Sequence, residues 1–533
     1  MKKSFAVLLI VLLTASLYAG GSKAPTAAPA ASTSSAAGPF SYPIPGKPVL
    51  SYFGQLHVKI ASNYKSYADL DIVKYWFEQT GVTLDFNTPP AGMETEQLNI
   101  MLASGDLTDL ICYNLAGMPG GLKKLYDDNI IINLSKNKVA EYMPNMMKFF
   151  NDNPAIYRQV KDDDGDLYVI PFLKGGGYLL ATTGTMIRDD ILRDLNLAIP
   201  ETLDEWETVM TAMKTAYPKS SPYVGDFTML RSSFMPAYGI SNAMWFEDTN
   251  HKIHYTPLEP AYKDFLMRMA KWYSMGLIDP NLATIDGKTV DNSMSSGNAF
   301  STFRAGSSGL GAYLNANKDN PKFSIVGVRQ PDLKKGEIVK YITDFEYGGN
   351  PQVGISTKCK NIEAAMRMYD WAWSPEAYLR LNWGIEGESF TYVNGKPQYT
   401  DLILNNPNGL NIDTILARYA LTAIKGPAMM VQDPDYIVQY YNLPGQKQAM
   451  DQWIIKDMDH RSFPPVSYLS QEASDYTRIM ADLDTYVQQM SYKFILGTES
   501  FDRWDSFTST IKNMSADQAI KIQQTAVDRY NKR

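Results

Sequence analysis

Residues 51–113 decide the fold, and they read SYFGQLHVKIASNYKSYADLDIVKYWFEQTGVTLDFNTPPAGMETEQLNIMLASGDLTDLICY. Hydrophobic periodicity in this stretch predicts three short strands separated by two helices, in chain order at residues 51–54, 68–80, 82–86, 94–103 and 110–113. Strands that alternate with helices are typical of a parallel sheet covered by helices. The sequence therefore predicts an α/β fold.

Further elements are predicted downstream of this stretch. The turn at residues 162–166 (DDDGD) is expected to form a tight hairpin turn that leads into a strand at 167–171. Thr202 and Glu205 form a predicted capping box at the start of a helix that continues to about residue 213. Other helices are predicted at 187–195, 261–275 and 362–373, and over most of 471–533.

The composition excludes several classes of function. With 533 residues, of which 45% are apolar and 20% charged, the chain can form more than one folded domain. Its formal net charge of -7 argues against capture of nucleic acid or of an anionic membrane. Four His and two Cys are too few to favour a zinc site or a Cys/His nucleophile, so we expect no metal and no cofactor. In contrast, 34 Tyr, 21 Phe and 9 Trp suggest recognition of a ligand by stacking.

The N-terminal residues have the pattern of a secretory signal peptide. Lys2 and Lys3 precede an apolar run at 5–13, and small residues follow, so residues 1–21 are predicted to be cleaved after export. Residues 22–47 are expected to be a flexible linker, because the Ala, Ser, Thr and Pro that dominate its first part cannot form a core. Gly20 stands where a lipoprotein would carry its lipid-bearing Cys. We therefore expect a periplasmic protein with no transmembrane segment in the mature chain, with the cell surface or the medium as alternatives.

Several motifs that suggest a metal site or an enzyme have simpler interpretations. If Gly165 is placed sixth in a calcium loop, Val160 stands first and Pro171 last where carboxylates are required, so a turn is favoured over a metal site. His251 and His254 lie in a predicted hairpin arm, where residues three apart face opposite sides of the strand, so a metal site formed by this pair is disfavoured. No Gly-x-Ser-x-Gly motif or zinc-protease motif is present, although paired carboxylates of a glycoside hydrolase stay possible.

The two cysteines, Cys112 and Cys359, lie in apolar or strand-like segments. Two free thiols are favoured over a disulfide, because sequence alone does not place their Cα atoms within bridging distance.

Five blocks in the body of the chain resemble blocks of a known family in the same order. They are ASGDLTD at 103–109; YMPN at 142–145 with DG at 164–165 and YVIP at 168–171; IRDDIL at 187–192 with PETLDEW at 200–206; NWGIEGESF at 382–390 with GKP at 395–397; and AVDRY at 526–530. They resemble bacterial extracellular solute-binding proteins, family 1, the LipO-like carbohydrate-binding proteins of ABC importers. Thr108 departs from the pattern, since proline is usual there.

This resemblance implies a two-lobed periplasmic-binding-protein (Venus flytrap) α/β fold with extra C-terminal helices. Lobe 1 is expected at 48–171 plus 344–420, and lobe 2 at 172–343 plus 421–533. Such proteins trap a ligand in the cleft between lobes that close about a hinge. The expected partners are an oligosaccharide and the transmembrane subunits of an ABC permease, and we expect a monomer that is not an enzyme.

Candidate ligand-binding residues follow from two arguments. Aromatic and polar residues after strands or near the lobe crossings are favoured, because ligands bind beyond the carboxyl ends of strands. These residues are Tyr113, Phe172, Arg188, Trp245, Phe303, Phe345, Glu346 and Tyr347. The resemblance adds Trp383 and Glu386 from the block at 382–390. For each aromatic residue, burial in a core is the alternative; for Arg188 the alternative is an ion pair, and for Glu386 a turn.

Most of the remaining tryptophans are predicted to be core residues on helix faces. They are Trp76, Trp206, Trp371, Trp373 and Trp453.

The favoured function is that of an exported receptor that delivers an oligosaccharide to an importer. A secreted glycan-active enzyme is the alternative from another class, since it would also need aromatic subsites. A peptide-binding or sensor protein with the same fold is a third possibility.

Overall fold

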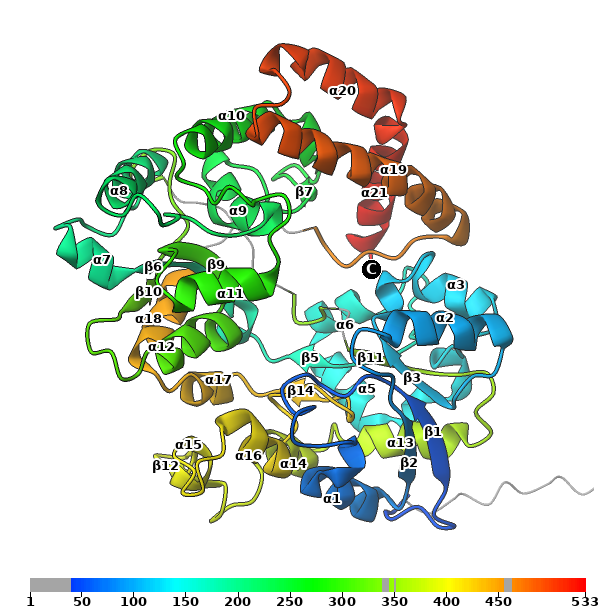
Figure 1. Ribbon diagram of the computed structural model, residues 1–533. Coiled ribbons are helices and arrows are strands. Elements are labelled where there is room, and N and C mark those ends of the chain that lie inside the picture. Colours follow the sequence, from blue (N-terminus) through cyan, green and yellow to red (C-terminus); the bar gives the residue numbers. More distant parts are fainter. Residues whose placement is uncertain (1–39, 338–344, 349–350, 455–462) are drawn as a thin grey trace, which may run out of the picture. The chain divides into compact units, whose positions relative to one another are not determined.

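The structure of the chain is a computed structural model that describes residues 40–337, 345–348, 351–454 and 463–533 (Figure 1). The predicted signal peptide and the linker up to residue 39 lie outside the described residues. Residues 42–533 form one compact unit. The predicted division of this unit into lobes at the stated boundaries stays a prediction.

A five-stranded sheet contains the strands predicted from residues 51–113. Its order is β2-β1-β3-β11-β4, with β1 (Val49–Phe53), β2 (Thr83–Asn87), β3 (Leu110–Tyr113), β4 (Ile170–Pro171) and β11 (Gln352–Ile355). Strand β1 pairs in parallel with β2 and β3, which confirms the predicted parallel arrangement. Strand β11 is antiparallel to β3 and β4, and it brings a distant segment into this sheet.

Helices cover both faces of this sheet because successive side chains of a strand point to opposite sides. Tyr52 lies in the core on one face and Phe53 in the core on the other. The Tyr52 face packs on α1 (Asp71–Thr80), α5 (Pro144–Asp152), α13 (Ile362–Trp371) and α14 (Pro375–Trp383). The Phe53 face packs on α2 (Glu94–Ser104) and α3 (Gly121–Asp127).

A second, antiparallel sheet has the order β10-β6-β9, with β6 (Thr183–Arg188), β9 (Ser301–Ala305) and β10 (Ile325–Gly327). The core associated with it is formed largely by helices, among them α8 (Leu203–Ala216), α9 (Phe227–Phe234) and α10 (Pro260–Ser274). The predicted C-terminal helices join the same core as α19 (Ser470–Ile495), α20 (Trp504–Asn513) and α21 (Ala516–Tyr530), drawn in brown to red in Figure 1.

Smaller elements complete the described fold. Two hairpins are formed by β7 (Trp245–Glu247) with β8 (Ile253–Tyr255) and by β12 (Phe390–Val393) with β13 (Lys396–Tyr399). Strand β5 (Leu173–Lys174) pairs in parallel with β14 (Val431–Gln432). The other α-helices are α4 (Val139–Tyr142), α6 (Pro154–Val160), α7 (Asp189–Asp194), α11 (Gly287–Ser295), α12 (Ala312–Ala316), α15 (Asp401–Leu404), α16 (Ile412–Tyr419), α17 (Asp435–Tyr440) and α18 (Pro444–Trp453).

Two predicted elements differ from those observed. The helix predicted at 187–195 begins only at Asp189, because Ile187 and Arg188 pair with β10 as the end of β6. The predicted turn at 162–166 forms, but only Ile170 and Pro171 of the following segment are in a strand, and that strand pairs with β11 rather than within a hairpin.

Other local predictions are confirmed. The Thr202 hydroxyl accepts from the Glu205 backbone N–H at 3.2 Å, and the Glu205 carboxylate accepts from the Thr202 N–H at 3.1 Å, as a capping box requires. All five tryptophans that were predicted to be core residues are buried. Both cysteines are free, and burial raises the pKa of Cys112 to about 11 and that of Cys359 to about 12. Neither thiol is therefore a nucleophile at neutral pH.

Candidate ligand-binding site

A cavity of about 520 Å³ is the strongest candidate for a binding site among the described residues. Its lining residues come from five segments, at 114–123, 159–168, 241–243, 345–348 and 463–468. The first two and the fourth belong to predicted lobe 1, and the other two to predicted lobe 2. The volume lies within the range of pockets that hold small ligands.

The end of strand β3 positions one part of the cavity. Asn114 follows the last residue of β3, and its side-chain oxygen accepts from the Gly117 backbone N–H at 3.2 Å, which holds a short turn. Gly120 and Gly121, with φ of 90° and 64°, then lead the chain into α3. Both glycines line the cavity, so backbone forms part of this wall.

Asp162 contributes a buried carboxylate to the same wall. Its Oδ1 accepts from the backbone N–H groups of Asp164 at 3.0 Å and Asp166 at 2.8 Å, and its Oδ2 accepts from the Tyr168 hydroxyl at 3.0 Å. Burial raises the pKa of Asp162 although these hydrogen bonds oppose the shift. The carboxylate is therefore committed to the turn that carries it.

A hydrogen-bonded group fixes the segment at 345–348. The Gln159 side chain donates to Glu346 Oε2 at 2.7 Å and accepts from the Tyr347 backbone N–H at 3.1 Å. The Tyr347 hydroxyl donates to Gln352, and burial raises the pKa of Tyr347, so this hydroxyl stays protonated. The arrangement presents Phe345 and Tyr347 to the cavity.

Aromatic rings stand behind the wall at 463–468. Tyr468 lines the cavity and stacks on Tyr476 with a centroid distance of 5.4 Å and an interplanar angle of 16°. Tyr476 lies 6.2 Å from Trp245, which lies 4.6 Å from Tyr255, again between ring centroids. Trp245 therefore lies behind this wall and packs on Tyr476, which in turn packs on the lining residue Tyr468.

The cavity wall carries little net charge. Lys123 and Asp162 are the charged residues among those that line it. Lys123 is paired with Asp127 on the next turn of α3, and Asp162 holds its own turn as described above. The uncharged polar side chains of the wall are mainly amides and hydroxyls, from Asn114, Ser241, Asn242 and Ser467. Such a wall can hydrogen-bond hydroxyl groups and stack on apolar faces.

The structure brings four of the sequence-predicted residues to or beside the cavity. Phe345 and Tyr347 line it, and Glu346 is bonded to Gln159, which lines it. Tyr113 precedes Asn114 and shares a hydrogen bond of 2.8 Å with Thr95 through its hydroxyl.

The other six predicted residues lie outside the described lining. Phe172 and Trp245 are buried in cores, Phe303 is half-buried on β9, and Arg188 forms a two-pronged ion pair with Asp190 at 2.7 and 2.5 Å. Trp383 is fully buried and donates to Asp433 at 2.9 Å, while Glu386 is exposed in a turn after α14. A ligand contact by any of the ten residues stays a prediction.

Sequence reasoning did not select several lining residues. They include Asn114, Gln159, Asp162, Asn242, Phe463 and Tyr468. The sequence could have indicated Asn114 as a candidate binding residue, since it directly follows a predicted strand. The segment FPPVSY at 463–468 carried another, because paired prolines between helical stretches are typical of an extended crossing.

The part of the chain that the structure describes contains no group of three or more His, Cys, Asp or Glu side chains that could hold a metal ion. His254 instead contacts Glu259 at 2.9 Å and Asp248 at 3.1 Å. Among the described helices, none is both long and apolar enough to cross a membrane.

Comparison with known families identifies the class of protein. The model of the bacterial extracellular solute-binding protein family matches residues 59–378, more than half of the chain. The chain belongs to this family. It is therefore an exported binding protein rather than an enzyme, as the sequence predicted.

Individual relatives cover most of both chains. The fructooligosaccharide ABC transporter substrate-binding protein FusA of Streptococcus pneumoniae is 22% identical over 485 residues, which are 85% of this chain and 86% of FusA. Lipoprotein LipO of Bacillus subtilis is also 22% identical, over 83% of this chain and 86% of LipO.

Solved structures show the same fold. The alginate-binding protein AlgQ2 superposes with a TM-score of 0.72 at 23% identity, over 92% of this chain and 99% of AlgQ2. A solute-binding protein from Bifidobacterium longum infantis, described as binding HMO, gives a TM-score of 0.70 at 18% identity, over 91% and 99% of the two chains. The predicted two-lobed α/β fold is confirmed.

Proposed function

We propose that this protein is the substrate-binding protein of an ABC importer for an uncharged oligosaccharide. The ligand binds in the 520 Å³ cavity, the lobes close about a hinge, and the closed form delivers the ligand to the permease. The observation that carries the proposal is the chemistry of the cavity wall, which combines aromatic rings with amides and hydroxyls and has almost no free charge.

Each part of this wall suits a sugar. The C–H faces of a pyranose or furanose ring stack on aromatic side chains, here the half-buried Phe345, Phe463 and Tyr468. Asn114 and Asn242 carry both donors and acceptors, which match sugar hydroxyls that also do both. An anionic sugar would need an unpaired cation, and the Lys123 ammonium on this wall is already paired with Asp127.

The names of related proteins support the same ligand class. FusA is named for fructooligosaccharides and has been crystallised with kestose, and the Bifidobacterium protein is described as binding HMO. We extend this class, but no particular sugar, to the present chain. We also propose a periplasmic location and a monomeric state.

A thermal-shift screen tests the proposal. Neutral oligosaccharides of two to six units, such as kestose and stachyose, should raise the melting temperature, because a ligand that binds only the folded state stabilises it in proportion to ln(1 + [L]/Kd). Acidic oligosaccharides and short peptides form the other arms of the screen. A shift with a peptide and with no sugar of any length would overturn the carbohydrate proposal in favour of a peptide receptor.

Substitution of a cavity aromatic tests the location of the site. Phe345→Ala should weaken binding of a neutral oligosaccharide by about fivefold to thirtyfold, since a lost stacking contact costs about 1–2 kcal/mol. Tyr392→Ala is the control, because Tyr392 is an exposed aromatic residue on the hairpin strand β12. Equal affinities of the two variants, measured by titration calorimetry, would place the site elsewhere.

A further inference from the structure

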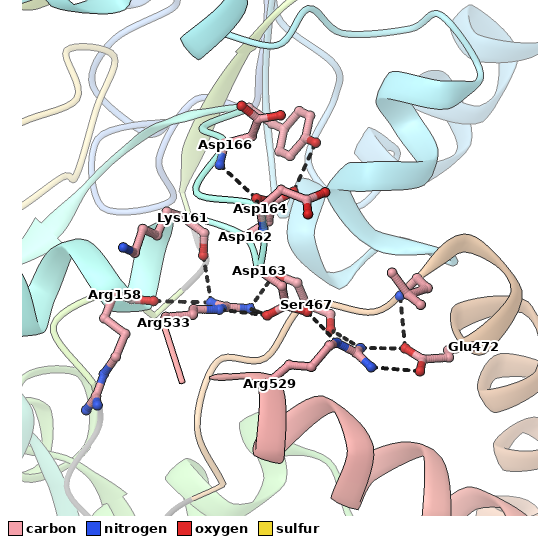
Figure 2. A network of polar contacts seen from close by, with 12 residues as sticks. Arg158, Lys161, Asp162, Asp163, Asp164, Asp166, Ser467, Glu472, Arg529 and Arg533 are labelled. Carbon is pink, nitrogen blue, oxygen red and sulfur yellow. Dashed lines mark hydrogen bonds and ion pairs between the residues drawn. The ribbon is translucent and has the colours of Figure 1, made fainter. Parts of the chain in front are cut away.

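One carboxylate outside the cavity is held by two arginines from the C-terminal end of the chain. Asp163 Oδ2 accepts from Arg529 Nε at 2.6 Å, and Asp163 Oδ1 accepts from Arg533 Nε at 2.8 Å. Figure 2 shows this carboxylate between the two guanidinium groups. Asp163 belongs to the turn at 162–166, whereas Arg529 lies on α21 and Arg533 follows it.

The same arginines also hold the segment that leads into α19. Arg529 makes two hydrogen bonds to the Glu472 carboxylate, at 2.9 and 2.6 Å, and a third to the Ser467 carbonyl at 3.2 Å. Arg533 donates to the Ser467 hydroxyl at 2.8 Å and to the Lys161 carbonyl at 2.6 Å. We call Asp163, Glu472, Arg529 and Arg533 the arginine brace.

The arginine brace joins two walls of the cavity from outside. Asp163 and Lys161 are sequence neighbours of Asp162, which lines one part of the wall, and Ser467 lines another. None of the four brace residues is itself a lining residue. The brace can therefore set the distance between the two walls without touching the ligand.

The charges of the brace are largely withdrawn from water. The side chains of Asp163, Glu472 and Arg529 are 16%, 19% and 23% exposed, and that of Arg533 is 1% exposed. The Arg529–Glu472 pair is two-pronged, which makes it stronger than an exposed pair, and loss of one partner from the brace leaves a largely buried charge uncompensated. Breaking the brace should thus change the position of the segments that it joins.

We propose that the arginine brace positions the two cavity walls for the ligand, so that Asp163, Glu472, Arg529 and Arg533 raise ligand affinity without contacting the ligand. When only a fraction of a receptor is in the binding-competent state, its apparent Kd equals the intrinsic Kd divided by that fraction. The brace keeps the walls in the competent arrangement. This inference rests on the proposed function, because it assigns a positioning role at the same cavity.

The first test uses the ligand-free protein. Asp163→Asn should speed hydrogen exchange in residues 162–168 and 463–469, the two segments that the brace joins. Asp291→Asn is the matched control, because it breaks another partly buried pair, in which Arg304 Nε donates to Asp291 at 2.9 Å with side-chain exposures of 22% and 34%. If exchange in the two segments is unchanged by Asp163→Asn, the brace does not hold the walls and the inference is wrong.

The second test uses a neutral oligosaccharide that raises the melting temperature in the screen. Asp163→Asn and Glu472→Gln should each raise its Kd by about tenfold, mainly through faster dissociation, while Asp291→Asn should change it less than about twofold.

The outcomes separate the two proposals. If hydrogen exchange is faster in Asp163→Asn but the wild-type protein binds no sugar, the proposed function is contradicted, whereas the role of the brace in holding the two walls is not. Faster exchange with an unchanged Kd would show a structural role alone and would overturn the positioning role. Glu472→Gln repeats the test at the second carboxylate of the brace, should Asp163→Asn fail to fold.

Discussion

At the scale of single residues, the structure explains one block of the family resemblance by backbone geometry. Gly384 follows α14 with a φ of 94°, and a Cβ there would lie 2.3 Å from Ser389 Oγ and 2.9 Å from Tyr419 Cβ. Ser389 Oγ donates to the Trp383 carbonyl at 2.8 Å and accepts from the Ile385 N–H at 2.7 Å. The small residues of NWGIEGESF therefore form a tight turn, whatever ligand role Trp383 and Glu386 have.

Substitution at this turn should be costly. Gly384→Ala combines an unfavourable backbone conformation with a steric clash, so it should lower the free energy of unfolding by about 2–4 kcal/mol. Gly387→Ala is the control, because Gly387 also has a positive φ of 81° but no atom lies within 4 Å of its added Cβ. Denaturant unfolding should show a cost of only about 1 kcal/mol for the control. An equal loss of unfolding free energy in Gly384→Ala and Gly387→Ala would mean that neighbouring atoms move to relieve the clash at residue 384.

At the scale of elements, a buried carboxylate joins two helices. Asp370 on α13 accepts from the backbone N–H of Met146 at 3.0 Å and from the Asn145 side chain at 2.9 Å, at the N-terminus of α5. The cap residue of α5, Met143, provides no side-chain cap of its own, so α13 supplies the missing acceptor. This contact gives a physical reason for the Pro-Asn pair in the block YMPN.

Asp370 should make stability depend on pH in an unusual direction. Burial raises the pKa of Asp370 from 3.8 to about 6, and the hydrogen bonds only partly oppose this shift. Between these two pH values the folded state binds more protons than the unfolded state, so this group makes the protein more stable as the pH falls from about 7 to 4. The effect is at most about 3 kcal/mol, from about two pKa units at 1.36 kcal/mol each.

Unfolding by urea at pH 5 and pH 7.5 measures this effect. Asp370→Asn keeps an oxygen for the Met146 N–H but does not titrate. The free energy of unfolding at pH 5, relative to that at pH 7.5, should therefore be lower in the variant than in the wild type. If wild type and variant show the same difference, the carboxyl group does not titrate in this range.

At the scale of the whole molecule, the described residues bury two large and separate cores. One lies beneath the five-stranded sheet and contains Leu50, and the other contains the C-terminal helices and Leu483. Chain segments pass repeatedly between the two, since residues 352–355 return to the first sheet and residues 470–530 to the second core. Because the two described clusters share no buried residue, each core can lose packing independently of the other.

Calorimetry can test this independence. Leu50→Ala and Leu483→Ala each remove a fully buried side chain, at a cost of about 2–5 kcal/mol. We expect the ligand-free protein to unfold in two transitions, with each variant lowering the temperature of a different one. Equal shifts of a single transition by both variants would show one cooperative unit instead.

Patterns within short stretches predicted much of the fold. The strands and helices of residues 49–113, the capping box at Thr202 and the buried tryptophans depend on periodicity and local hydrogen bonds, which the sequence displays directly. The predicted strand at 167–171 is only two residues long, and α7 begins two residues later than predicted, because partners far along the chain decide where a strand begins and ends.

The sequence by itself determined the family, the α/β class and an aromatic-rich chain without the residues of common catalysis. Only the tertiary structure decided which aromatic residues face the cavity. Half-buried Phe345 lines it, whereas Trp245 and Trp383 are buried away from it, because a ring in a core and a ring in a cleft follow the same hydrophobic pattern. Likewise, Asp163 and Arg529 are 366 residues apart, and no local rule of sequence brings two such charges together.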